Sequence, residues 1–293
     1  MRDTSCLLLT LSLLILLCGC RRHQPQPISE VPATYLDLNG AELSSHIITS
    51  PPPLRLSQEE WNQLTGSACG GEEYIPYLLH ISAQGLVEEA TLQPYQSWCN
   101  TQKMPSDPPP YIQKHLAEAE SLSREGRFQP WIINGHPAAV IFRTSIAIAP
   151  PEKYGPSRAF PKPVDPSSVI ITMQMNGCEG RCPAYKVTIH GDGTVEYQGY
   201  AYVAVKGNQT AHIPPEAVSE LLRQFDQANF FSALPKYIGA YDGGDVVLQL
   251  DVNHISHTVV DGSGMRVGLP TSIDKLERLI DQTANTHPWV FGT

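Results

Sequence analysis

The chain has 293 residues, of which 41% are hydrophobic, and its formal net charge at pH 7 is −9. This length is sufficient for one large hydrophobic core or two small ones. The negative charge argues against a basic surface that would attract polynucleotides, so we expect no nucleic-acid partner.

The N-terminal segment is typical of an exported protein. Arg2 precedes an apolar run from Leu7 to Leu17. This run is too short to span the hydrocarbon core of a bilayer, which requires about 20 residues. The pattern therefore predicts a signal peptide and not a transmembrane helix. A secretory signal that is cleaved nearby, or an uncleaved anchor, is the alternative.

The leader ends with Leu17-Cys18-Gly19-Cys20. This sequence resembles the lipobox of bacterial lipoproteins. The resemblance implies that residues 1–19 are the signal peptide and that Cys20 is lipidated as the new N-terminus. Buried acyl chains contribute about 0.8 kcal/mol per CH₂, so several chains anchor a protein without a spanning helix. Because Arg21 and not aspartate follows Cys20, the sorting pattern implies an outer-membrane anchor that faces the periplasm of the cell envelope.

Residues 20–53 are rich in proline and poor in large apolar side chains. Such a composition does not bury enough apolar surface to offset the entropy cost of ordering the chain. We therefore expect a flexible tether between the membrane and the first domain.

The pattern of residues 54–149 predicts the order strand, strand, helix, strand, strand. Gly85 lies in a short loop between the first two strands, and Asn134-Gly135 is a strong turn signal between the last two. The predicted strands cover 74–82, 86–94, 127–133 and 138–148, and the predicted helix starts at Pro108 and ends near Gly126.

Four cysteines are left for disulfides once the leader and Cys20 are set aside: Cys69, Cys99, Cys178 and Cys182. In a hairpin centred on residue 84, cross-strand partners have residue numbers that sum to 168, and Cys69 and Cys99 satisfy this sum. If the register extends that far, the two thiols lie opposite each other and form a disulfide. Two buried free cysteines are the alternative.

Three motifs in this first domain carry a family resemblance: Gly85-Leu86-Val87, Gly126-Arg127-Phe128-Gln129-Pro130-Trp131 and Asn134-Gly135-His136-Pro137-Ala138. They resemble the C-terminal domain of TonB-type energy transducers, in which a small sheet adds a peptide strand from an outer-membrane receptor. Energy transducers keep an uncleaved membrane helix, whereas this chain has a lipobox and a short tether. The resemblance implies a ββαββ domain with an open sheet edge.

Residues 150–166 contain many prolines and almost no apolar side chains. A proline-rich segment tends to polyproline II and holds its neighbours apart. We expect this segment to be the linker between two domains.

The pattern of residues 167–293 predicts a second α+β domain, with two hairpins and two helices. The closing helix starts at Thr271, and Asp274 is placed for a capping box. The predicted strands cover 169–175, 186–190, 194–202, 246–252 and 255–261, and the first helix starts at Pro214.

Further motifs in this second domain are Cys-x₃-Cys-Pro-x-Tyr from Cys178, Gly-Asp-Gly-x-Val-x-Tyr-x-Gly from Gly191, and Tyr241-Asp242. They resemble an uncharacterised bacterial domain family, known only as a domain of unknown function, over almost the whole segment. The resemblance brings no established activity.

The spacing of Cys178 and Cys182 favours a structural disulfide. A thioredoxin-type redox site has two residues between its cysteines and opens a helix, whereas here three residues intervene before a strand. We expect no metal site, because two thiolates lack a second nearby pair of ligands. His254 and His257 point to opposite faces of a strand. Asp242, Asp245 and Asp251 lack the ligand spacing of an EF-hand.

The prediction is an α+β fold of two small domains, each with antiparallel β-hairpins packed against one or two helices. We expect a membrane-anchored envelope lipoprotein that acts as a non-enzymatic binding module, with no cofactor and with an envelope protein or peptide as partner. Two alternatives stay open. One is an enzyme with a site near Cys178, Asp242 and Asp245, and the other is a TonB-like accessory that binds receptor peptides by strand addition.

Overall fold

The computed structural model shows an α+β fold whose strands and helices surround two hydrophobic cores. It describes residues 34–35, 46–66, 74–93, 109–239 and 244–292. We call residues 34–149 the first region and residues 150–292 the second region, and each contains one core. The α+β class is as predicted. No helix among the described residues has both the length and the apolar character needed to cross a membrane.

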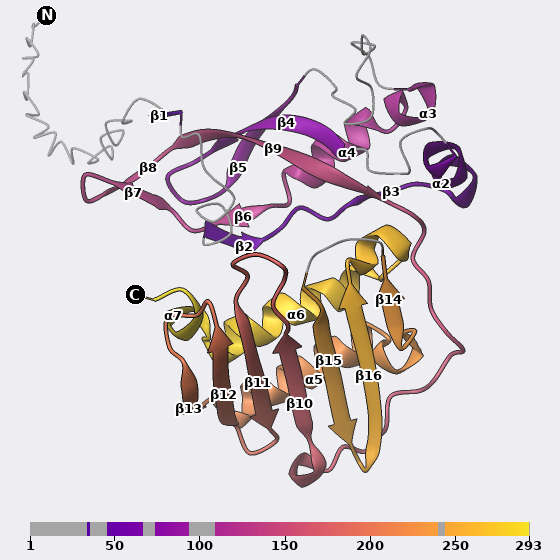
Figure 1. Ribbon diagram of the computed structural model, residues 1–293. Coiled ribbons are helices and arrows are strands. Elements are labelled where there is room, and N and C mark those ends of the chain that lie inside the picture. The colour runs from indigo at the N-terminus through magenta and orange to yellow at the C-terminus, as the bar shows by residue number, and fades with distance from the viewer. Residues whose placement is uncertain (1–33, 36–45, 67–73, 94–108, 240–243, 293) are drawn as a thin grey trace, which may run out of the picture. The chain divides into compact units, whose positions relative to one another are not determined.

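Strand β4 (Tyr74–Ile81) is the centre of the first region's sheet, with β5 (Val87–Leu92) and β9 (Val140–Ala149) antiparallel on either side (Figure 1). Side chains on alternate positions are buried, as the two-residue period of a strand requires. The buried side chains of β4 are Ile75, Tyr77, Leu79 and Ile81, and those of β9 include Val140, Phe142, Ile146 and Ile148.

The hairpin of β4 and β5 differs from its predicted register. Ile81 pairs with Val87, which gives the predicted sum of 168, but His80 pairs with Glu89 and Leu79 with Ala90, because the register shifts between His80 and Ile81. Such a shift is a β-bulge, in which Glu88 is the extra residue of β5. The premise that placed Cys69 opposite Cys99 therefore fails one residue into the hairpin. Both cysteines lie outside the described residues.

Shorter strands complete the first region. β1 (Thr34–Tyr35) and β3 (Leu54–Arg55) run parallel to β9. Asn134 and Gly135 have φ angles of 52° and 80°, which is the turn that an Asn-Gly pair favours. β2 (Ile47–Thr49) pairs with β6 (Arg127–Phe128), and β7 (Trp131–Ile133) pairs with β8 (His136–Ala138). Part of the predicted tether, residues 20–53, is therefore paired, through β1 and β2.

The predicted helix of the first region is broken in two, α3 (Pro110–Gln113) and α4 (Leu116–Ser123). Both helices contribute to the core, in which Ile112 and Ala119 are buried. At the break, Nε2 of His115 lies 3.1 Å from Oε1 of Glu60. Glu60 belongs to α2 (Gln58–Thr65), where it completes a capping box with Ser57.

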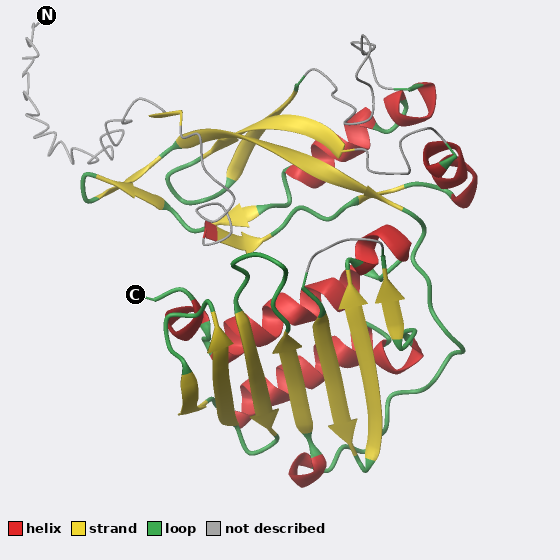
Figure 2. Cartoon of the chain, in the orientation of Figure 1, coloured by secondary structure: helices red, strands yellow, loops and turns green. Residues whose placement is uncertain are grey.

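The second region contains one seven-stranded sheet of order β13-β12-β11-β10-β15-β16-β14. All neighbours are antiparallel except β14, which runs parallel to β16. Helices α5 (Pro215–Gln227) and α6 (Thr271–Ala284) cover one face of the sheet (Figures 1 and 2). The strands are β10 (Ile170–Met175), β11 (Ala184–His190), β12 (Thr194–Ala201), β13 (Gly207–His212), β14 (Lys236–Ile238), β15 (Val246–Val252) and β16 (Ile255–Gly262).

The predicted strands and helices of this region are present, but the sequence did not indicate that they join in one sheet or that β13 and β14 form its edges. The predicted capping box of α6 is wrong. Pro270 is the N-cap residue, so the helix starts at Thr271 and Asp274 lies one position too far along to close a box. The carboxylate of Glu152 instead accepts a 2.8 Å hydrogen bond from the backbone N–H of Thr271.

Residues 150–166, which we call the strap, differ from the free spacer that their prolines predict. The strap is hydrogen-bonded along the second region: the N–H of Lys153 donates to the carbonyl of Gly268 and that of Gly155 to Ser232, at 2.8 and 2.7 Å. Phe160 packs edge-on against Phe231 of the core. The strap is therefore a structural part of the second region.

Candidate functional site

One row of residues crosses four neighbouring strands of the seven-stranded sheet. The register pairs Tyr185 with Met175, Met175 with Val246, and Val246 with Asp261. Directly paired residues of antiparallel strands project to the same face. Tyr185 of this row is hydrogen-bonded to Asp281 of α6, so the row faces that helix.

Helix α6 presents three acidic side chains to this row. Asp274, Glu277 and Asp281 are three and four residues apart, which places them on one face of the helix. Single carboxylate oxygens of Asp261, Asp274 and Glu277 all lie within 4.8 Å of one another. We call these three residues the carboxylate cluster.

The environment of Asp261 disfavours its charge. Burial, followed by the nearby carboxylates of Asp274 and Asp245, raises the pKa of Asp261 to about 6, although the backbone N–H of Gly264 donates a 2.5 Å hydrogen bond to it. The carboxylate of Asp245 lies against Gly262, the neighbour of Asp261. A Cβ at position 262 would lie 2.7 Å from Oδ1 of Asp245, so glycine leaves room for this carboxylate. Asp245 and Asp261 thus add to one negative field.

Glu277 is the member of the cluster whose negative charge is least offset by hydrogen bonds and ion pairs. Burial raises its pKa well above the usual range, and the charges of Asp261 and Asp274 act in the same direction. Within the part of the chain that the structure describes, the buried Oε1 of Glu277 has no hydrogen-bond partner. Arg278 forms its ion pair with Asp274 instead. A buried carboxylate without a donor is costly unless it binds a proton or a cation.

The tyrosine of the Cys-x₃-Cys-Pro-x-Tyr motif lies at the other end of this acidic face. The hydroxyl of Tyr185 donates a 2.6 Å hydrogen bond to Asp281, and burial raises the pKa of Tyr185. The sulfur atoms of Cys178 and Cys182 lie at disulfide distance, with their Cα atoms 5.5 Å apart. The disulfide constrains the turn between β10 and β11, as expected of a structural bridge.

The other predicted site residues are not gathered around a reactive centre. Cys20, Cys69, Cys99 and Asp242 lie outside the described residues. Asp245 is joined to the cysteine turn through its carbonyl, which accepts a 2.8 Å hydrogen bond from the N–H of Asn176. Its carboxylate lies beside Gly262.

Only one of the two histidines of the β15–β16 hairpin lies on a strand, so the prediction that both project from a strand is wrong for His254. His254 lies in the turn with a φ of 62°. Nε2 of His257 lies 3.1 Å from the carbonyl oxygen of Ala233, and burial lowers the pKa of His257. Asp251 accepts a 2.8 Å hydrogen bond from Gln249. These contacts give His257 and Asp251 structural roles in the sheet.

Sequence reasoning missed the carboxylate cluster. Asp261 ends a strand, and Asp274 was assigned to a cap. Glu277 lies beside the apolar positions Ile273, Leu276 and Ile280 of α6, which are buried. The position of Glu277 beside this apolar helix face was the available sequence signal for the cluster. Asp261 comes close to Glu277 only through the register of the sheet.

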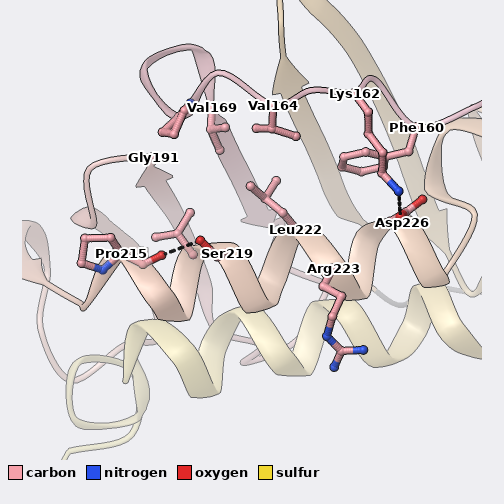
Figure 3. A pocket seen from close by; sticks show the side chains of 12 residues that line it. Phe160, Lys162, Val164, Val169, Gly191, Pro215, Ser219, Leu222, Arg223 and Asp226 are labelled. Carbon is pink, nitrogen blue, oxygen red and sulfur yellow. Dashed lines mark hydrogen bonds and ion pairs between the residues drawn. The ribbon is translucent and has the colours of Figure 1, made fainter.

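A groove of about 410 Å³ lies between the strap and α5 (Figure 3). We call it the strap groove. Leu222 points from α5 toward Val164 of the strap, and an ion pair of 2.6 Å between Lys162 and Asp226 lies at one end. The apolar residues of its walls are Phe160, Val164, Val169, Pro215, Val218 and Leu222.

Residues 169–284 match the model of a family described as Domain of unknown function (DUF6438). This range contains the cysteine turn, the carboxylate cluster and the whole of α5. A comparison with curated proteins finds no match to the chain.

Proposed function

We propose that this protein is a lipid-anchored protein of the cell envelope whose second region is a binding module. The observation that carries the proposal is the strap groove. Ligand sites are typically concave and mainly apolar, with volumes of about 300–1,000 Å³ and a few polar groups that orient the ligand. The strap groove has this size and lining.

The partner is an envelope protein or peptide that inserts apolar side chains between Val164 and Leu222. The exposed Lys162–Asp226 pair gives the groove one polar end, which orients a peptide by its backbone or by a polar side chain. Anchoring rests on the lipobox resemblance at Cys20, and a lipid anchor brings the module to partners at the membrane surface.

A photo-crosslinking amino acid in the native envelope tests the binding module. At Leu222, in the groove, we expect a crosslinked adduct. At Gln227, which is exposed on the same helix outside the groove lining, we expect none. Leu222→Glu should abolish capture by a crosslinker at Val164 while the protein stays folded and abundant. Equal adducts at Leu222 and Gln227, or none at either, would refute the groove as the binding site.

The anchor is tested separately by metabolic labelling with a fatty-acid analogue. The wild-type protein should be labelled and Cys20→Ala should not. Equal labelling of the two proteins would refute lipidation at Cys20 and leave the groove experiment unaffected.

A second candidate function is strand addition in the first region. β5 is the last strand of its sheet, and apart from the bridge between Leu86 and Arg127, no described strand pairs with its outer edge. Such an edge presents backbone groups to an added peptide. The N–H of Gln93 donates to Pro76 of β4, so the N–H of its neighbour Leu92 faces the outer edge. A proline at Leu92 should block receptor-peptide binding, whereas Leu92→Ala should not. If both variants bind equally, this edge is not used.

A further inference from the structure

The carboxylate cluster contains more negative charge than the described residues around it compensate. Asp261 comes from β16 and Asp274 and Glu277 come from α6, so the fold and not local sequence brings them together. Asp245, which precedes β15, acts electrostatically on Asp261, and Asp281, on the next turn of α6, acts on Glu277. Convergence of this kind is unfavourable unless a positive species neutralises it.

The described cations nearby offset only part of this charge. Arg278 pairs with Asp274, a member of the cluster, and its charge also lowers the pKa of Glu277. Arg55 acts electrostatically on Asp274, but its guanidinium donates hydrogen bonds to the carbonyl of Leu269 and the hydroxyl of Thr271, at 2.5 and 3.2 Å. Among the described residues, no hydrogen bond or ion pair joins either arginine to Glu277.

The second observation is independent of the number of acids. Oε1 of Glu277 is completely buried and has no hydrogen-bond partner among the described residues, and the carboxylate is directed into the cluster. Buried polar atoms are almost always paired, so an unpaired one calls for a specific explanation. A bound ion is one such explanation.

We propose that the carboxylate cluster binds one Ca²⁺ ion. The candidate ligands are all carboxylate oxygens, which select hard cations over zinc or copper. Oxygens that lie within 4.8 Å of one another are close enough to share one ion. Calcium accepts several carboxylates in irregular geometry, whereas magnesium keeps several waters and is usually held by one or two carboxylates, so three converging carboxylates favour calcium. Water completes the coordination.

The test measures thermal unfolding of the full-length protein in detergent at pH 7.5, after removal of metals with a chelator. CaCl₂ at ten times Kd should raise Tm by about 3–6 °C, and MgCl₂ should raise it much less. Glu277→Gln keeps the shape of the side chain and should lose the calcium-dependent rise. Glu220→Gln should retain it, because Glu220 pairs with Arg223 on the exposed side of α5.

No calcium-dependent rise in the wild-type protein would mean that the cluster holds protons, and it would overturn the proposal. A full rise in Glu277→Gln would place the calcium elsewhere and overturn it too, and an equal rise with MgCl₂ would overturn the choice of calcium. Asp274→Asn is a second variant if Glu277→Gln does not fold, with the same expected loss of the rise. Terbium luminescence sensitised by nearby tyrosines, displaced by CaCl₂ in the wild type only, is an independent readout.

Discussion

The hydroxyl of Tyr185 donates a 2.6 Å hydrogen bond to Oδ2 of Asp281, and Thr286 donates another, of 2.7 Å, to Oδ1 of the same carboxylate. Tyr185 lies on β11 and Asp281 on α6, so this bond fastens the helix to the sheet. Tyr185 follows the cysteine turn directly. The turn fixes the start of β11, and this places the hydroxyl of Tyr185 next to Asp281.

Tyr185→Phe should lower the free energy of unfolding by about 1.5–3 kcal/mol. The variant removes a hydrogen bond to a buried carboxylate and leaves one of its oxygens without a donor. Urea denaturation measures the change. Tyr200→Phe is the control, because Tyr200 is exposed and its hydroxyl bonds to Gln198 on the surface. A loss below about 0.5 kcal/mol for Tyr185→Phe would contradict a role in fastening α6.

The stability of the second region should depend on pH through Asp261. Its pKa is about 6 in the folded protein and about 3.9 in an unfolded chain. The folded state therefore binds more protons in this window. The contribution of Asp261 is fully present below pH of about 4 and falls by about 3 kcal/mol as the pH rises through about 6.

Asp261→Asn isolates this contribution, because the amide does not titrate and its oxygen still accepts from Gly264. In the presence of a chelator, the difference in unfolding free energy between the wild type and Asp261→Asn should change between pH 4 and pH 8. Relative to the variant, the wild type should lose stability as the pH rises. A difference that stays constant across this range would show that Asp261 keeps an ordinary pKa.

Replacing both Cys178 and Cys182 with serine should reduce stability and leave function otherwise intact. The bridge closes a loop with a sequence separation of 4, for which the chain-entropy model gives about 2 kcal/mol. Cellular phenotype and protein abundance are measured together, and the phenotype should weaken only as far as the protein unfolds. A folded, abundant variant without function would instead make the cysteine pair a reactive site and favour an enzyme.

The strap should resist proteolysis more than its proline content and exposure suggest. Its backbone is hydrogen-bonded to the second region, and Phe160 packs against the core. Phe160→Ala should increase the rate of cleavage after Arg158 about tenfold, because losing about 1.4 kcal/mol of packing makes local opening tenfold more frequent. Cleavage is followed by mass spectrometry. Rapid cleavage of the wild-type strap into two folded pieces would support a free linker.

Local patterns predicted the elements well where one short stretch contains the whole signal. The start of α5 at the N-cap residue Pro214 and the turn at Asn134-Gly135 are examples, since helix starts and turns depend on local sequence. β13 carries little apolar signal, with the sequence GNQTAH, and β14 has three residues, so neither was predicted.

The features that depend on distant residues could not be predicted in this way. The bulge adds Glu88 to β5, and the consecutive exposed residues Glu88 and Glu89 interrupt the alternation there, but this interruption does not determine the register of the paired strand. Asp261 meets Glu277 only because β15 and β16 pair in one register and α6 crosses above them. The anchors of the strap, such as Ser232, lie more than 70 residues further along the chain.

The strap also determines where an autonomous fragment of this protein has to begin. A recombinant fragment that starts at Val169, where the family match begins, would lack Glu152, which caps α6, and Phe160, which packs against the core. One that stops at Ala284 would lack Val290, which is buried in the same core. The smallest piece that retains all of these contacts extends from Glu152 to the end of α7 (His287–Val290). A fragment that keeps this core complete is therefore longer, at both ends, than the range of the family match.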